Sequence, residues 1–222
     1  MSTTKILSVL ALLAIIAIGA FLYLTRPVAA PTNTSAEVSI APEGQKRFVL
    51  SDESFATFHI YEELNGSPKT VIGTTTAVSG EVVIDPAHPE ATVIGPLHIN
   101  ARTFITDNER RNAAIARLIL KAEDPANEFI VFTPTKLDGF PEHPQVEQEL
   151  SFTVTGDLHI MNTTKPVTFN VKAKAESEDR ITGVATASVL RSDFGIVVPS
   201  LPFLANVGDS VELQLSFVLE AK

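Results

Sequence analysis

The chain has 222 residues, with 17 basic and 26 acidic side chains, a net charge of −9 and no cysteine. The acidic balance argues against a nucleic acid partner, because phosphate binding needs clustered Lys and Arg. The lack of cysteine excludes a disulfide framework, a cysteine-ligated zinc site and a cysteine nucleophile. With 45% hydrophobic and 19% charged residues, most of the chain has the composition of a folded domain.

The first feature in chain order is an uncharged apolar run from Ile6 to Leu24. A helix of that length spans about 28 Å, close to the hydrocarbon thickness of a bilayer. It is also longer than the apolar core of a typical signal peptide. The sequence therefore predicts a signal anchor, or transmembrane helix, within residues 1–25. The alternative is a signal peptide cut after Val28-Ala29-Ala30, although Pro31 is unfavourable directly after such a cut.

The residues around the apolar run suggest where the remainder of the chain lies. Lys5 and the amino terminus precede the run and Arg26 follows it, a weak bias toward an internal N-terminus. We therefore expect a single pass of the cytoplasmic membrane through residues 6–24, with the folded domain in the periplasm or the extracellular space. Residues 26–45 are rich in proline and small polar residues, and they are predicted to be a flexible linker.

From residue 46 to residue 222, apolar and polar residues alternate along most segments. Such alternation is typical of strands with one wet face, and it favours an antiparallel sheet. A short polar turn around Asn162 joins two of the predicted strands in a hairpin. The predicted strands are 47–51, 54–64, 69–76, 80–85, 91–103, 128–137, 151–160, 167–176, 180–190 and 211–220.

One segment has helical rather than strand spacing. Thr106-Asp107-Asn108-Glu109 has the form of a capping box, and an amphipathic helix is predicted over 107–121. One helix with about eight to ten strands indicates a barrel or a sandwich, with the helix over one end or edge.

Two features bear on whether the interior is hollow. The alternating residues Ala173, Ala175, Gly183, Ala185 and Ala187 are all small. They either leave room for a ligand or accommodate the helix or a tight bend of the barrel. The apolar segment 194–207 carries two prolines, so it is expected to be a loop. It acts either as a lid over a ligand mouth or as a plug of the barrel core.

The sequence contains no recognisable catalytic or metal-binding pattern. No two of the five His residues have the i, i+2 or i, i+4 spacing of a ligand pair. The nucleophile motif G-x-S-x-G and the glycine-rich phosphate loops are also absent. We therefore predict no metal, no cofactor and no catalytic residue, and the chain is not expected to be an enzyme.

Four stretches carry a resemblance to a known family. They are Phe48–Ser51 with Ser54–Phe58, Thr106–Asn112, Thr155–Ile160 with Thr164–Val167, and Arg191–Ile196 with Val207–Val211. In this order and spacing they resemble the YceI-like family of polyisoprenoid-binding proteins over about residues 47–222. The chain departs from the family pattern at Asn112, where Asp is usual, and at Ala114-Ile115, where His-Leu is usual.

The resemblance implies a mainly β, antiparallel lipocalin-like barrel with one amphipathic helix. This barrel domain would occupy residues 46–222 and follow the N-terminal transmembrane helix and the linker. It also implies non-catalytic binding of an isoprenoid or other long-chain amphiphilic lipid in a hydrophobic cavity. The alternatives are an extracytoplasmic structural or partner-binding β domain with a filled core, and a lipid hydrolase. The expected ligand-binding side chains are Phe58, Phe152, Val154, Leu158, Phe169, Val171, Ala173, Ala185, Ala187 and Phe194.

Overall fold

The computed structural model describes residues 15–20, 22–23, 26–32, 44–85, 87–88, 91–141, 144–198 and 204–222. The predicted membrane segment falls only partly within these residues. Residues 15–20, 22 and 23 are helical and exposed, and the rest of 6–24 lies outside the described residues. No helix among the described residues has both the length and the apolar character needed to cross a membrane. Residues 33–43 of the predicted linker and 199–203 of the predicted lid or plug also lie outside them.

The described chain is mainly antiparallel β-structure, as the alternating pattern predicts. The elements are β1 (Lys46–Leu50), β2 (Phe55–Leu64), β3 (Ser67–Thr75), β4 (Val78–Ser79), β5 (Glu81–Ile84), β6 (Val93–Ile94), β7 (Leu97–Asn100), α2 (Glu109–Ala114), η2 (Ile115–Ile119), η3 (Pro125–Asn127), β8 (Phe129–Asp138), β9 (Glu149–Ile160), β10 (Thr163–Ser177), β11 (Arg180–Leu190), η4 (Arg191–Phe194), β12 (Leu204–Ala205) and β13 (Ser210–Ala221).

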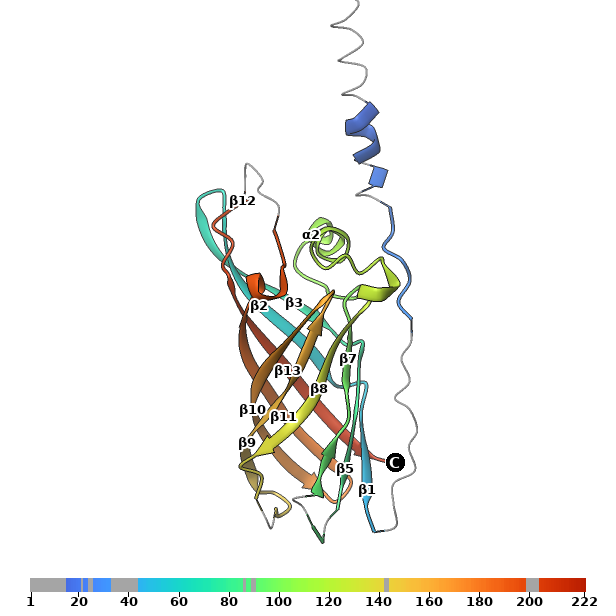
Figure 1. Cartoon of the computed structure of the whole chain (residues 1–222), viewed down its shortest axis with the longest axis vertical. Coiled ribbons are helices and arrows are strands. Elements are labelled where there is room, and N and C mark those ends of the chain that lie inside the picture. The colour runs from blue at the N-terminus through green and yellow to red at the C-terminus, as the bar shows by residue number, and fades with distance from the viewer. Residues whose placement is uncertain are drawn as a thin grey trace, which may run out of the picture.

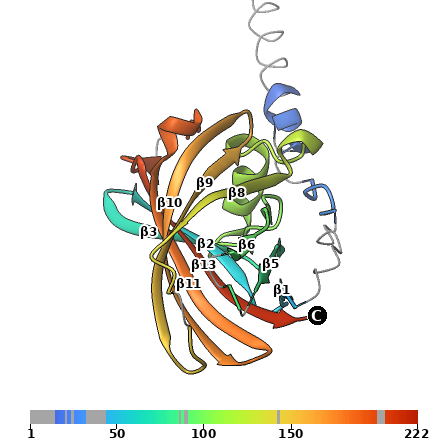
Figure 2. The same ribbon diagram turned by 60° about the horizontal axis from the view of Figure 1, so that its bottom comes forward.

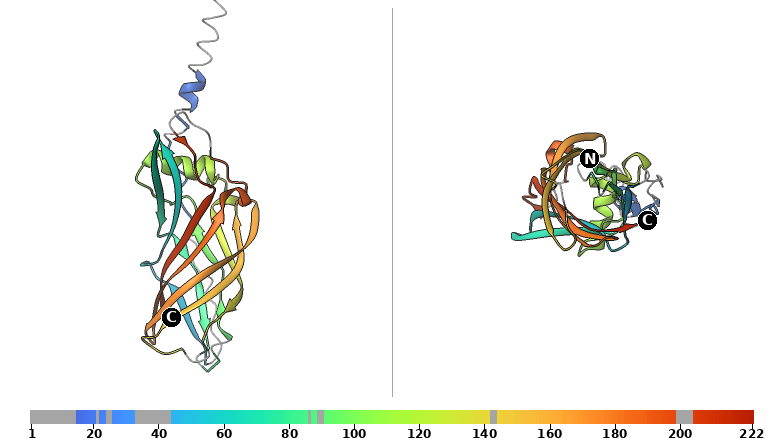
Figure 3. Two further views of the ribbon diagram at one scale, coloured as in Figure 1. Left: turned by 90° about the vertical axis from the view of Figure 1, so that its left-hand side faces the viewer. Right: turned by 90° about the horizontal axis from the view of Figure 1, so that it is seen from below.

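The strands form one antiparallel sheet that curls into a half-barrel (Figures 1 and 2). Its central part follows chain order from β7 through β8, β9, β10 and β11 to β13. Only Gly80 separates β4 from β5, yet β4 pairs with β7 while β5 pairs with β1 and β6. The view from below in Figure 3 shows the resulting curved outline. The barrel-like architecture expected from the resemblance is therefore present.

Along one edge, strand β13 pairs with two successive partners. Its first half pairs with β2 and its last residues pair with β1. The break between these partners contains Ser54, whose fully buried side chain donates to the Val218 carbonyl (3.2 Å) and accepts the Val218 N–H (3.0 Å). These two bonds satisfy the backbone of β13 where the ladder is interrupted.

The predicted strands differ from the observed ones in identifiable ways. The segment 91–103 is not one strand, because Gly95 and Pro96 divide it into β6 and β7. The hairpin of β9 and β10 is confirmed, and its two-residue turn lies at Met161 and Asn162. Pairing therefore begins at Thr163, four residues before the predicted strand.

The predicted helix over 107–121 is shorter and less regular than expected. The six-residue helix α2 continues directly into η2, a π-helical turn. The cap is Asn108, whose Oδ1 accepts the N–H of Arg110 (2.9 Å), so the predicted start at Asp107 is wrong by two residues. Asn112 Oδ1 accepts both the N–H (2.7 Å) and the hydroxyl (2.6 Å) of Thr106, which ties the helix to the chain before it.

The two halves of the barrel are packed differently. The half nearer α2 is filled by side chains such as Phe104, Ile115 and Phe194. The ring of Phe58 lies edge-on to that of Phe104, with 5.2 Å between ring centroids. The half farther from α2 contains the cavity described below.

Candidate functional site

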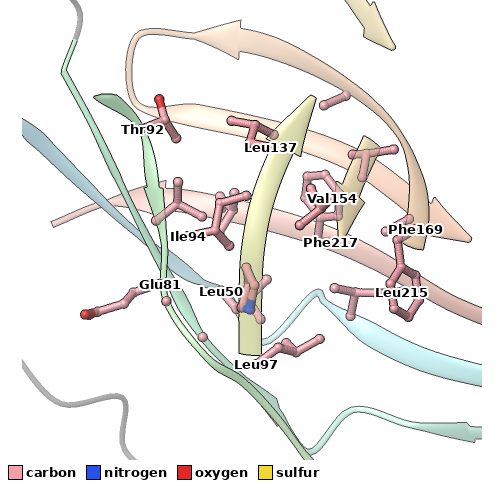
Figure 4. A pocket seen from close by; sticks show the side chains of 18 of the residues that line it. Leu50, Glu81, Thr92, Ile94, Leu97, Leu137, Val154, Phe169, Leu215 and Phe217 are labelled. Atoms are coloured by element: carbon pink, nitrogen blue, oxygen red, sulfur yellow. The ribbon is translucent and has the colours of Figure 1, made fainter. Parts of the chain in front are cut away.

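An apolar cavity of about 160 Å³ lies inside the barrel. It extends from the middle of the barrel toward the strand ends farthest from α2, where β8 and β10 finish and β9 and β11 begin. Side chains from several strands converge on it (Figure 4). The apolar side chains that line it are Leu50, Val82, Ile84, Ile94, Leu97, Phe132, Pro134, Leu137, Phe152, Val154, Phe169, Val171, Ala173, Ile181, Ala185, Leu215, Phe217 and Leu219.

The alternating pattern explains why these residues face inward. On β9, β10, β11 and β13, every second side chain points to the same side of the sheet. Cross-strand pairing then aligns the inward positions, so that Ala185 lies between Val171 and Leu215. Small residues at some of these positions leave space that larger ones would occupy.

Gly183 contributes to the shape of the cavity wall. Gly183 pairs with Phe217 across β11 and β13, and a Cβ atom added at Gly183 would lie 2.4 Å from the Phe217 ring. Only glycine lets that ring lie so close to the neighbouring backbone. The position of the Phe217 ring at the cavity wall therefore depends on Gly183.

Glu81 and Thr92 are the polar side chains among the residues that line the cavity. The Glu81 carboxylate points away from the apolar side chains (Figure 4). It accepts hydrogen bonds from Nε and Nη2 of Arg47 at 2.8 and 2.7 Å. The cavity interior therefore offers dispersion contacts and apolar burial, which suit a hydrocarbon chain.

No group of three or more His, Asp or Glu side chains close enough to hold a metal ion occurs among the described residues. The surroundings of the cavity also bring no Ser–His pair to its wall. What the cavity wall offers chemically is an apolar surface.

Six of the ten predicted ligand-binding residues line this cavity: Phe152, Val154, Phe169, Val171, Ala173 and Ala185. The structure brings these six together from β9, β10 and β11. Their contact with a ligand remains a prediction.

The other four predicted residues lie in the filled half, nearer α2. Phe58 packs against Phe104, while Leu158 and Ala187 belong to the buried core. Phe194 is only 2% exposed, and it borders a separate surface pocket that the exposed residues Lys165 and Leu190 also line. Alternation shows which side chains point inward, but it carries no information about their level along the barrel. That is why these four do not reach the main cavity.

The sequence prediction also missed lining residues. The lining residues Leu215, Phe217 and Leu219 follow the same alternation in β13, so the sequence pattern could have predicted that they face the interior. Alternation could not have predicted Leu137, because a β-bulge between Pro134 and Lys136 shifts the register of β8 against β9. The bulge changes which side chains face inward after it.

Comparisons with known proteins agree on the fold. A family model described as the YceI-like domain matches residues 49–219. A UPF0312 protein of Pseudomonas fluorescens is 28% identical over 198 residues, which are 86% of this chain and 89% of that protein.

Two solved structures resemble the barrel. The first is a polyisoprenoid binding domain from Saccharophagus degradans implicated in plant cell wall breakdown, 15% identical, with a TM-score of 0.61 over 79% of this chain and 98% of that one. The second is BcnA of Burkholderia cenocepacia, 18% identical, with a TM-score of 0.58 over 76% and 98% of the two chains. At these identities the likeness shows a shared fold.

Proposed function

The chain belongs to the YceI-like domain family, and from this premise we propose that its barrel binds the apolar tail of an isoprenoid or similar long-chain amphiphilic lipid without catalysis. The observation that carries the proposal is the cavity, whose inner wall is apolar and whose one carboxylate is turned away into an ion pair. The name of the Saccharophagus degradans neighbour, a polyisoprenoid binding domain, points to the same ligand class.

The size of the cavity limits how much of a ligand it holds. Its volume of about 160 Å³ is close to that of an engineered apolar cavity, about 150 Å³, that takes up benzene. Pockets for drug-sized ligands are about 300–1,000 Å³. The cavity as it stands therefore holds one end of an isoprenoid chain, and a longer insertion requires lining side chains such as Phe152 to move.

The alternative of a domain with a solid core fits only the half of the barrel nearer α2. There Phe58 packs against Phe104, and Phe194 belongs to the same buried cluster. A purely structural domain with a filled core does not account for the cavity in the other half.

The membrane part of the proposal rests on the sequence. The uncharged run 6–24 is long enough to span a bilayer. We propose that it is an uncleaved signal anchor in the cytoplasmic membrane, with the barrel in the periplasm or the extracellular space. Flotation of the full chain with vesicles, and the N-terminal residue of the mature protein, test this part.

The ligand proposal is tested by extraction. The full chain is purified in detergent. Bound lipid is then extracted with organic solvent and analysed by mass spectrometry. We expect the extract to contain a copurifying long-chain amphiphile. A separate sample of folded, delipidated protein should bind farnesol saturably. Protein that carries no amphiphile and shows no saturable farnesol binding would refute the proposed function.

A further inference from the structure

Residues 26–32, which the sequence assigns to a flexible linker, make specific contacts with the barrel. The Thr32 N–H donates to Glu128 Oε1 at 2.6 Å, and the Thr32 carbonyl accepts from Asn100 Nδ2 at 3.3 Å. The Ala30 carbonyl accepts from Arg102 Nη1 at 3.0 Å. These bonds use the main chain of the segment, and the side chain of Thr32 also hydrogen-bonds to the Glu128 carboxylate.

The preceding residues are held in a second group of contacts. The side chain of Arg117 is fully buried, and its guanidinium donates to the carbonyl of Tyr23 (2.9 Å) and to that of Arg26. Glu123 forms ion pairs with both Arg117 and Arg26. The Arg26 guanidinium also lies over the Tyr23 ring, 4.3 Å from its centroid. The end of the N-terminal helix is therefore fixed against η2.

The groove that receives this segment contains buried charge. Glu128 is only 3% exposed, and its Oε2 pairs with Arg102 at 2.9 Å while its Oε1 accepts from Asn100 at 2.9 Å. Burial favours the protonated carboxyl, but hydrogen bonds from Thr32 and Asn100 and the charge of Arg102 hold the pKa of Glu128 below its ordinary value. Residue Thr32 thus completes the set of donors around a buried carboxylate.

We propose that residues 26–32 are a docking strap, which binds this groove and fixes the N-terminal helix at the α2 end of the barrel. Figures 1 and 3 show that helix leaving the molecule at the α2 end. The cavity extends from the middle of the barrel toward the other end. If the membrane tether of the proposed function holds, the strap turns the α2 end toward the bilayer and the cavity end away from it.

Exposed apolar side chains occur at the α2 end, and Val93 (62%) and Val146 (51%) are exposed near the cavity end. Ile105, just before α2, is 67% exposed, and Leu118 of η2 is 40% exposed. Tyr61 and Ile72, on the outer face of β2 and β3, are also largely exposed. Side chains of this kind are favoured at a bilayer interface and unfavoured in water. The orientation has a functional consequence, since it places the cavity in the half of the barrel that faces away from the membrane.

The strap is tested by a distance between two spin labels, which the absence of native cysteine makes simple. The pair Ala29→Cys and Ala126→Cys joins an exposed strap position to an exposed barrel position. In the full chain in detergent we expect a single narrow distance distribution. Adding Thr32→Pro removes the N–H that Glu128 accepts, and it should broaden the distribution. The matched variant Thr32→Ser keeps both that N–H and the hydroxyl, and its distance distribution should remain narrow. A broad distribution with native Thr32 overturns the strap.

The orientation is tested by single fluorescent labels on the full chain in phosphatidylethanolamine–phosphatidylglycerol vesicles that contain headgroup-nitroxide lipid. Arg110→Cys marks the α2 end and Glu178→Cys marks the turn between β10 and β11. We expect quenching at position 110 and little at position 178, and equal or reversed quenching overturns the orientation. Failure to float with the vesicles overturns the tether and the orientation together. The strap itself is then decided by the distance between positions 29 and 126 in detergent.

Discussion

Replacing Ala185 by Phe should fill the cavity and remove ligand binding while the barrel still folds. Ala185 faces the cavity from β11, between Val171 of β10 and Leu215 of β13, and both of these neighbours also line the cavity. A ring added at this position enters the space that the proposed lipid tail occupies. Because the space is already present, the larger side chain needs little displacement of the backbone.

The magnitude follows from the area that the ring takes. A buried Phe side chain removes about 150–250 Å² of apolar surface from water. The cavity has a volume of about 160 Å³, so a ring inside it leaves little room for a lipid tail. At about 25 cal/mol per Å², the burial denied to the lipid is about 4–6 kcal/mol. Part of that is offset in wild-type binding by immobilisation of the tail. A loss of about 3 kcal/mol is therefore a conservative expectation, which corresponds to about a hundredfold weaker affinity.

The assay compares farnesol titrations of delipidated wild type, Ala185→Phe and Val184→Phe, with thermal unfolding followed by circular dichroism. Val184 is the matched control, because it precedes Ala185 on the same strand but points outward and is 36% exposed. We expect lost affinity only in Ala185→Phe, with a melting temperature close to that of wild type. A folded Ala185→Phe protein that binds farnesol as tightly as wild type would show that the ligand does not occupy this cavity.

Three further outcomes are expected. Phe194→Ala should destabilise the barrel by about 3–5 kcal/mol without changing farnesol affinity, because Phe194 is buried outside the main cavity; a selective loss of affinity would contradict this. Gly183→Ala should destabilise the sheet by about 1–3 kcal/mol and weaken binding, since its Cβ would displace the Phe217 ring; unchanged melting would argue against that contact. The pKa of Glu128 is lowered from 4.5, so its charge stabilises the folded state above that pH, and the contribution is lost as the pH falls through the folded-state pKa. Denaturant unfolding of Glu128→Gln should accordingly depend less on pH in the acid range than that of wild type, and parallel curves for the two proteins would refute this.

The sequence alone determined most of the strands, and the inward side of β9, β10, β11 and β13. Alternation is a local property, and it identified β9, β10, β11 and β13 together with Phe152, Val171 and Ala185 as inward residues. The hairpin between β9 and β10 was equally local, since a two-residue turn leaves the register no freedom. The family resemblance added the barrel, and the match to the YceI-like domain confirms the family.

Only the tertiary structure decided where along the barrel the space lies. Phe58 and Leu158 have the same alternation as Phe152, yet they are packed beneath α2 and its neighbours rather than around the cavity. Which level is filled depends on contacts between segments distant in the chain, such as Phe58 with Phe104. The contact of Thr32 with Glu128 joins residues 96 positions apart, and no local pattern in a proline-rich segment indicates it. Periodicity reports the direction of a side chain, whereas its surroundings are set by whatever the folded chain brings against it.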